Sequence, residues 1–303
     1  MKFSVQLPTD RVEELEEFTT ANAIAELALA IETAGFDACY VTEHPFPADD
    51  WLEASGHHAL DPFVSLSAAA MVTRRLRLHT NLIVLPYRNP FLTAKSIASL
   101  DTLSGGRVIM GIGAGYLEGE YAALGADFAS RNDSTDDAIA AMQAAWSGKS
   151  VQRGGERYNA TGNTALPRPV QRPHPPLWVG GNSRIAIRRA ATSAQGWSPF
   201  PLPAAHAATV HTSAIETHAD LADKIGYLRR YSAEIGRDTR VEINFVPFGH
   251  GMNSKHAFDY PAFREEIAEL EALGVDWLSI GVPGNDRASY IDSIQQFGAE
   301  VIA

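Results

Sequence analysis

The stretch RNPFLTAKSIASLDTLSGGRVIMGIGAGYLEGE at residues 88–120 joins a helix, a glycine turn, a strand and a second glycine-rich loop without a gap. Asn89 and Pro90 supply an N-cap and a proline at the first helical position, and the run Ser-Gly-Gly at 104–106 ends the helix. Apolar residues at helical spacing form its buried face: Phe91, Ala94, Ile97 and Ala98. Residues 107–112 then predict a strand. This order is typical of one unit of a parallel βα barrel, with a loop at the strand's carboxyl end.

Three glycines alternate where that strand ends. Gly111, Gly113 and Gly115 leave one side of the backbone without side chains, so a flat or anionic ligand could lie against it. A tight barrel turn explains the same glycines, because glycine clusters commonly serve close packing. The residues alone leave both interpretations open.

The rest of the chain repeats this alternation of helices and apolar strands. Segments at 32–41, 102–111 and 271–281 each contain a helix that ends at glycine and runs directly into a β-rich segment, which indicates parallel strands joined by helices. Eight strands are expected, at residues 3–7, 36–41, 77–84, 107–112, 177–179, 196–198, 241–246 and 277–280. They predict a (β/α)8 TIM barrel. The alternative, an open doubly wound sheet, normally carries its glycine-rich loop after the first strand, where this chain has Pro-Thr-Asp at 8–10.

The length fits one barrel. With 303 residues, 45% of them hydrophobic, the chain can bury one large core, so a single domain is expected over residues 1–303. Residues 147–176 are rich in glycine and proline and lack a clean period. We expect this stretch to be an insertion near the site.

Charge and hydropathy exclude several classes of protein. A net charge of −11 argues against nucleic-acid binding, which needs a basic face. The absence of a long apolar run and of a signal-like N-terminus predicts a soluble, cytoplasmic protein with no membrane span. The one cysteine, Cys39, lies in an apolar run and is expected to be buried and inert.

Polar residues directly follow the second strand. Active sites of βα barrels lie at the carboxyl ends of the strands, so Glu43 and His44 are candidate catalytic residues, although a histidine there could simply cap a loop. The loop at 45–60 carries acidic residues and histidines without the spacing of a metal motif. We therefore expect a substrate lid and no metal site, with Trp51 either closing over a substrate or anchoring the loop.

The fifth strand ends in a pattern that can hold an anion. Gly180, Gly181, Ser183 and Arg184 lead from the strand into a helix, and free backbone N–H groups together with the helix dipole would favour a phosphate. An ordinary capped helix is the alternative.

Taken together, these motifs resemble the luciferase-like monooxygenase superfamily. The 88–120 stretch matches its pattern of NP, LSGGR and alternating glycines followed by an aromatic residue and a glutamate, and TEH at 42–44 and WVGGNS at 178–183 extend the match. The combination looks most like coenzyme F420-dependent oxidoreductases.

The resemblance implies roles for individual residues. His44 would handle the proton that accompanies hydride transfer, and Glu43 would be its acidic neighbour. The backbone at Gly180, Gly181, Ser183 and Arg184 would hold the cofactor phosphate. The cofactor ring would contact a strand bulge and the glycine loop, through Asn81, Leu82, Val84, Ala114 and Gly115, and in deazaflavin-using members such a bulge holds a non-prolyl cis peptide, here Asn81-Leu82.

The expected activity is hydride transfer between F420 and a small organic substrate, in a chain that forms a homodimer as superfamily members commonly do. Trp51 and Tyr116 are candidate substrate contacts. Glucose-6-phosphate dehydrogenases of the superfamily place a glutamate where this chain has Tyr116, so the resemblance does not extend to sugar-phosphate oxidation. Two alternatives stay open: a monooxygenase that uses reduced FMN and O₂, and a non-catalytic cofactor-binding protein.

Overall fold

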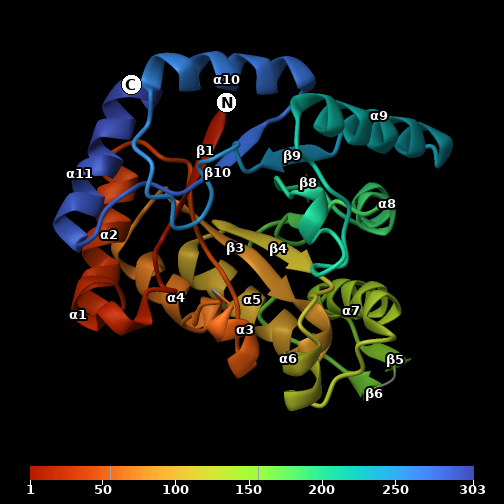
Figure 1. The fold of residues 1–303 in the computed structure, drawn as a ribbon. Coiled ribbons are helices and arrows are strands. Elements are labelled where there is room, and N and C mark those ends of the chain that lie inside the picture. Colours follow the sequence, from red (N-terminus) through yellow and green to blue (C-terminus); the bar gives the residue numbers. More distant parts are fainter. Residues whose placement is uncertain (55, 156) are drawn as a thin grey trace.

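The structure, a computed structural model, describes residues 1–54, 56–155 and 157–303. Eight parallel strands close into a barrel in the order β1-β10-β9-β8-β7-β4-β3-β2 (Figure 1). They are β1 (Lys2–Gln6), β2 (Ala38–Val41), β3 (Arg77–Val84), β4 (Val108–Gly113), β7 (Leu177–Gly180), β8 (Gly196–Ser198), β9 (Glu242–Phe245) and β10 (Trp277–Ile280). The predicted (β/α)8 barrel is confirmed, and each predicted strand overlaps an observed one.

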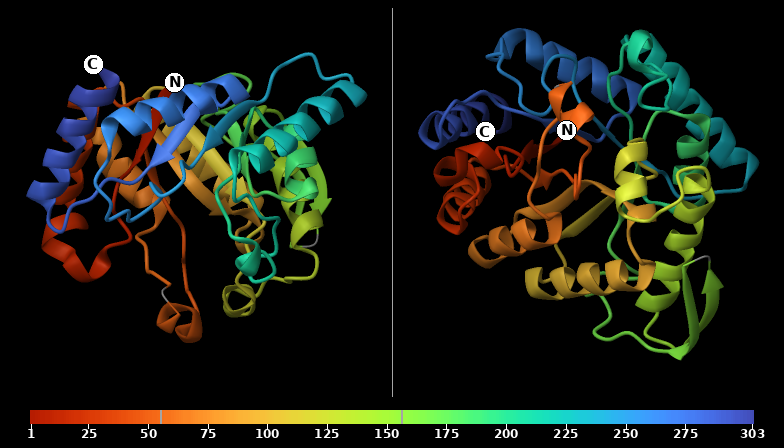
Figure 2. Two further views of the ribbon diagram at one scale, coloured as in Figure 1. Left: turned by 45° about the horizontal axis from the view of Figure 1, so that its top comes forward. Right: turned by 60° about the horizontal axis from the view of Figure 1, so that its bottom comes forward.

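Helices surround the barrel and occupy its connections (Figure 2). The α-helices are α1 (Leu15–Phe18), α2 (Ala21–Thr33), α3 (Asp49–Glu53), α4 (Pro62–Val72), α5 (Pro90–Ser104), α6 (Glu118–Ala123), α7 (Arg131–Trp146), α8 (Arg184–Ser193), α9 (His218–Glu234), α10 (Tyr260–Leu273) and α11 (Arg287–Phe297). Short 3-10 turns lie at η1 (Val12–Glu14), η2 (Leu85–Tyr87) and η3 (Ala204–His206), and a π-helical turn, η4 (Gly298–Ile302), follows α11. In the left view of Figure 2, α3 and α6 project together from one end of the barrel.

Helix α5 begins and ends as its sequence predicts. The Asn89 side chain accepts hydrogen bonds from the N–H groups of Phe91 and Leu92, and Pro90 occupies the first helical position. At the other end Gly105 has a φ of 69°, a left-handed conformation that a residue with a Cβ rarely adopts. The caps therefore fix where the chain turns into β4.

Strands β3 and β4 interlock. The register between them shifts between Thr80 and Ile83, which marks a bulge in β3. A Cβ on Gly111 would collide with the Thr80 carbonyl, one on Gly113 would lie 2.7 Å from the Leu82 side chain, and one on Gly115 would lie 2.6 Å from Val84. Each of the three glycines thus leaves room for one residue of β3. The residues that fill the space are alternate ones: Thr80, Leu82 and Val84.

This interlocking corrects the idea that the glycine face is bare backbone open to a ligand. Protein atoms of β3 occupy the space that the missing side chains leave. Of the two interpretations that the sequence left open, close packing accounts for Gly111 and Gly113.

One buried layer of the barrel contains an uncharged histidine. His79 on β3 is fully buried, with its Nδ1 3.3 Å from the Ser4 hydroxyl and its ring edge-on to Trp178 at 4.9 Å between centroids. Its Nε2 has no hydrogen-bond partner among the described residues. Burial, assisted by the nearby positive charge of Arg77, lowers the pKa of His79 from 6.5 to about 3.

The stretch at 147–176 was predicted to be irregular, and this was wrong for part of it. Two antiparallel strands, β5 (Val151–Gly155) and β6 (Tyr158–Asn163), form a hairpin that packs on α7. Arg153 and Tyr158 both contact the Asp137 carboxylate on that helix. The Tyr158 ring also lies edge-on to Phe91. Several glycines and few apolar residues leave only a weak alternation of the kind that signals a strand.

Candidate active site

His44 lies at the carboxyl end of β2 beside a carboxylate from a distant part of the chain. Its Nδ1 is 3.4 Å from Oε2 of Glu120, a residue of α6 whose side chain is 1% exposed. The contact does not meet hydrogen-bond geometry, and Nδ1 is buried without a hydrogen-bond partner among the described residues. Glu120 also accepts hydrogen bonds from the Phe46 N–H at 3.1 Å and the Tyr87 hydroxyl at 3.0 Å. Helix α6 therefore brings a buried acid to the proposed acid-base histidine.

Glu43 points in another direction and is fully engaged. One carboxylate oxygen accepts the Val84 N–H at 2.7 Å, and the other accepts Nε and Nη2 of Arg88 at 2.7 and 2.5 Å. Burial raises the pKa of Glu43, while the Arg88 guanidinium and the Val84 N–H act against that rise. Because both oxygens are occupied, this arrangement favours a role for Glu43 in fixing the end of β3 over a role in direct proton transfer.

Aromatic rings surround His44. The Trp51 ring lies 4.4 Å from the imidazole at a 35° tilt, and the His57 ring lies 4.8 Å away, edge-on. Burial raises the pKa of Tyr116, with the Glu120 charge adding to the rise and the Trp51 side chain opposing it, which places Tyr116 in the same group. Burial lowers the pKa of His57. The two predicted substrate contacts, Trp51 and Tyr116, thus lie with His44 at one mouth.

The predicted lid at 45–60 is described except for Ser55. Its short helix α3 carries Trp51 over the imidazole, so the loop covers His44 in this structure. No three His, Cys, Asp or Glu side chains of the described residues come together in a way that could hold a metal ion.

The bulge of β3 contains the cis peptide that the resemblance implied. Asn81-Leu82 is a cis peptide bond, and neither residue is proline. The Leu82 side chain lies against Gly113 on β4 and Gly180 on β7, where an added Cβ at either glycine would collide with it. Val84 packs with Tyr87 and Tyr121 in a small buried cluster, and the Tyr121 hydroxyl binds the Ala114 carbonyl. The residues expected to contact the cofactor ring are therefore assembled mainly on the β3–β4 edge.

The loop after β7 holds only part of the predicted phosphate cradle. The Gly181 N–H binds the Ser198 carbonyl, the Asn182 N–H binds the Thr212 hydroxyl, and the Ser183 hydroxyl caps α8 by accepting the Ala186 N–H. Gly180 leaves room for Leu82 rather than for a ligand. Gly181, with a φ of 107°, needs to be glycine for its backbone conformation.

Three donors of this loop stay available. The backbone N–H groups of residues 183–185 make no hydrogen bond within the described residues, as expected for the first turn of a helix. Lys224 of α9 reaches the same loop, with Nζ 3.3 Å from the Asn182 carbonyl, and burial together with the nearby Arg184 charge lowers its pKa. Arg184 itself lies over the Tyr227 ring, 5.4 Å from the centroid. Free N–H groups at a helix N-terminus beside a lysine suit an anion.

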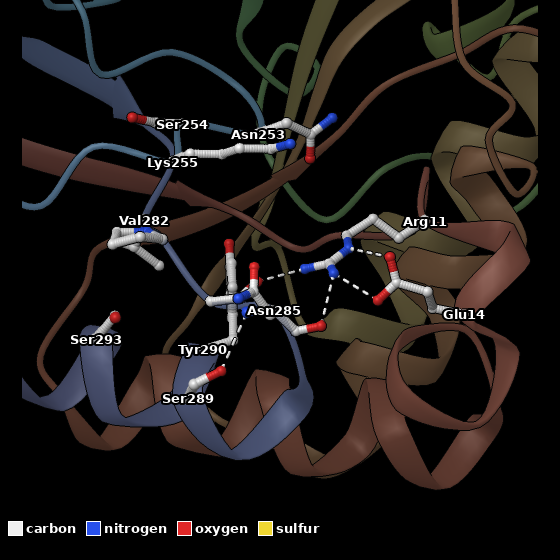
Figure 3. Close-up of a pocket in the computed structure, with 12 residues that line it drawn as sticks. Arg11, Glu14, Asn253, Ser254, Lys255, Val282, Asn285, Ser289, Tyr290 and Ser293 are labelled. Carbon is white, nitrogen blue, oxygen red and sulfur yellow. Dashed lines mark hydrogen bonds and ion pairs between the residues drawn. The ribbon is translucent and has the colours of Figure 1, made fainter.

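A polar cavity of about 790 Å³ opens between the loops that follow the carboxyl ends of β1, β9 and β10 (Figure 3). Its most prominent cation is already paired, since Arg11 binds the Glu14 carboxylate and the carbonyls of Gly284 and Asn285. Asn253 at its rim donates to the Asp10 carboxylate at 2.6 Å. Arg11 and Asn253 are therefore already paired within the protein.

Three residues of the site were not assigned by sequence reasoning. Glu120 ends the glycine-loop motif, Arg88 opens the quoted stretch, and Lys224 lies in the poorly patterned C-terminal part. The motif itself was a signal for Glu120. Its partner His44 lies 76 residues away, so the sequence offered no spacing that could link the two.

The fold and the site define a class of protein. It is a (β/α)8 barrel that carries a histidine at the carboxyl ends of its strands and a loop with free N–H groups that suits an anion. Within this class the chain belongs to the luciferase-like monooxygenase family, whose model matches residues 1–250. An uncharacterized protein of Mycobacterium tuberculosis is 30% identical over 295 residues, covering 91% of this chain and 95% of that protein.

Two solved structures share the fold. A monooxygenase, RslO1 from Streptomyces bottropensis, superposes with a TM-score of 0.76 at 21% identity and covers 100% of this chain and 99% of its own. A coenzyme F420-dependent tetrahydromethanopterin reductase from Methanopyrus kandleri gives a TM-score of 0.74 at 18% identity, with coverage of 99% and 98%. At these identities the likeness concerns the fold. None of the helices in the described residues is long and apolar enough to cross a membrane.

Proposed function

We propose that this protein is an F420-dependent oxidoreductase that moves a hydride between the deazaflavin and a small organic substrate. The observation that carries the proposal is the placement of His44 under aromatic rings at the barrel mouth, next to a buried acid. Family membership and the likeness to an F420-dependent reductase support it.

The residues present fit such a cofactor. The free N–H groups of Ser183, Arg184 and residue 185, with Lys224, would hold its phosphate, while Leu82 and Val84 would support one face of the ring. When bound, F420 supplies a carbon that accepts or donates a hydride.

The protein's own part in the reaction is to hold the substrate and move one proton. Trp51 and Tyr116 would form the apolar wall of the substrate pocket. His44 Nε2, at the ring edge opposite Glu120, would take the proton from a substrate hydroxyl as the hydride leaves the adjacent carbon, or return it in the reverse direction. The lid over His44 would exclude water from the reacting atoms.

Reduced FMN with O₂ is the second candidate, and the likeness to a monooxygenase favours it. The test is a fluorescence titration of the purified protein with F420 and with FMN. We expect F420 to bind at least tenfold more tightly, a difference of about 1.4 kcal/mol. Equal or reversed affinities would transfer the proposal to a flavin-dependent monooxygenase, and binding without turnover of any substrate would leave a non-catalytic cofactor-binding protein.

We further propose that the chain forms a homodimer through α4 and α5. These neighbouring helices expose four large apolar side chains, each about 70% exposed, at two-turn or three-turn spacing along each helix: Val64 and Met71 on α4, and Leu92 and Leu103 on α5. A self-complementary apolar face of this kind suits a twofold interface. Light scattering at defined concentration tests it, and Met71→Lys should shift the protein towards monomer.

A further inference from the structure

The buried carboxylate of Glu120 lacks the positively charged partner that the buried carboxylate of Glu43 has. Glu43 is compensated by the Arg88 guanidinium, whereas Glu120, although 1% exposed, makes no ion pair with Lys or Arg in the described part of the chain. Its two hydrogen-bond donors, the Phe46 N–H and the Tyr87 hydroxyl, are neutral. A buried carboxylate is costly unless it is paired or fully hydrogen-bonded.

A purely structural role would not require this charge. A glutamine at position 120 could accept the Phe46 N–H through its oxygen and donate its amide group to the Tyr87 hydroxyl oxygen, without burying a charge. Among the described residues, the side chain within ion-pair distance of Glu120 that can become positively charged is His44, whose Nδ1 lies 3.4 Å from Oε2. The acid is therefore matched to the imidazole rather than to the backbone around it.

The unsatisfied nitrogen points to the same pairing. His44 Nδ1 is buried and has no hydrogen-bond partner among the described residues, and the Glu120 carboxylate lies 3.4 Å away from it. Hydrogen bonds between catalytic groups are often long before a ligand binds and tighten in the complex.

We propose that Glu120 is a positioning residue that holds His44 as the Nδ1–H tautomer, so that Nε2 carries the lone pair that accepts the substrate proton. The catalytic part of this inference rests on the proposed function. The tautomer itself does not, because it depends only on the imidazole and its neighbouring acid. An orienting carboxylate of this kind also stabilises the imidazolium formed when Nε2 takes the proton.

The test records NMR spectra of protein labelled with ¹⁵N-histidine. It compares the wild type with Glu120→Gln and with the control variant Glu118→Gln. The His44 signals are identified by their loss in His44→Gln, and the spectra are recorded at a pH where the imidazole is neutral. We expect the wild type to show the Nδ1–H pattern and Glu120→Gln to show a large fraction of the Nε2–H form. Glu118→Gln, an exposed substitution on the same helix, should leave the spectrum unchanged.

Tyr87→Phe separates positioning from anchoring. It removes the hydroxyl that donates to Glu120 but leaves the carboxylate beside His44, so the Nδ1–H tautomer should persist. If Glu120 merely anchors Tyr87, both Tyr87→Phe and Glu120→Gln should lower the melting temperature without changing the tautomer. An unchanged tautomer in a folded Glu120→Gln variant would overturn the proposal.

Turnover gives the catalytic readout. With the cofactor that the titration selects, Glu120→Gln should lower kcat by roughly 10²-fold or more while KM changes less than threefold, since the substrate does not touch this residue. A kcat equal to that of the wild type would overturn the catalytic part. If the wild type itself turns over nothing, the proposed function fails, and the tautomer spectra alone decide the role of Glu120.

Discussion

Replacing His79 should remove a defined part of the protein's sensitivity to acid. This histidine is fully buried in the barrel with Nε2 unpaired, and its pKa is lowered to about 3 in the folded protein from an ordinary value of 6.5. Between these two values the unfolded chain binds a proton that the folded chain does not. His79 therefore costs the folded state almost nothing well above pH 6.5, and the free energy of unfolding falls as the pH drops below this value.

The magnitude follows from the two pKa values. At pH 5 the unfolded state gains about 2 kcal/mol relative to pH 8 from protonation of this one side chain. In His79→Gln that proton is not taken up, so between pH 8 and pH 5 the wild type should lose about 2 kcal/mol more free energy of unfolding than the variant. The variant carries its own cost from the changed side chain, but that cost should not depend on pH.

Urea unfolding of both proteins at pH 8, 7, 6 and 5 measures the difference. One value of m, the slope of the free energy of unfolding against urea concentration, is used for all the curves. His57, His174 and His250 also have lowered pKa values, so the comparison between wild type and variant isolates the share of His79. If the free energies of unfolding of the two proteins changed equally with pH, the reasoning would be refuted, because His79 would then accept its proton in the folded barrel.

Three further changes test the site. His44→Ala should lower turnover by roughly 10²–10⁴-fold with a smaller change in cofactor affinity, and unchanged turnover would remove His44 from the mechanism. Lys224→Gln should weaken F420 by about tenfold, yet leave a dephosphorylated deazaflavin analogue bound as in the wild type; equal losses for both ligands would argue against a phosphate at this loop. Arg88→Met should cost about 3–5 kcal/mol in urea unfolding because it leaves the buried Glu43 carboxylate unpaired, and Arg88→Met combined with Glu43→Gln should recover part of this, whereas an additive loss would contradict the pairing.

The barrel was predictable because its signals are local. The Asn89 cap, the Gly105 turn and the apolar strand after it each act within a few residues, and the strand at 77–84 was placed with the bounds that the structure has. The β5–β6 hairpin was not predictable, since its strands contain several glycines and little apolar alternation, and contacts to distant residues such as Asp137 on α7 help to hold them.

The site was predictable only where one residue could be read by itself. His44 and the loop at 180–184 follow strands directly, so their place at the mouth comes from the fold. Two details required the tertiary structure: that Gly180 accommodates Leu82, and that Glu120 faces His44. Both are contacts between segments far apart in the chain, which no local pattern specifies.

The interlocked edge of the barrel limits how this protein can be re-engineered. Because Gly111, Gly113 and Gly115 fit Thr80, Leu82 and Val84 one by one, neither strand can be exchanged alone for the corresponding strand of a relative with a different bulge. A chimaera made to alter cofactor preference would have to transplant residues 77–115 as one cassette. The cassette would carry α5 with it, and with α5 the face through which we propose that two copies of the chain associate.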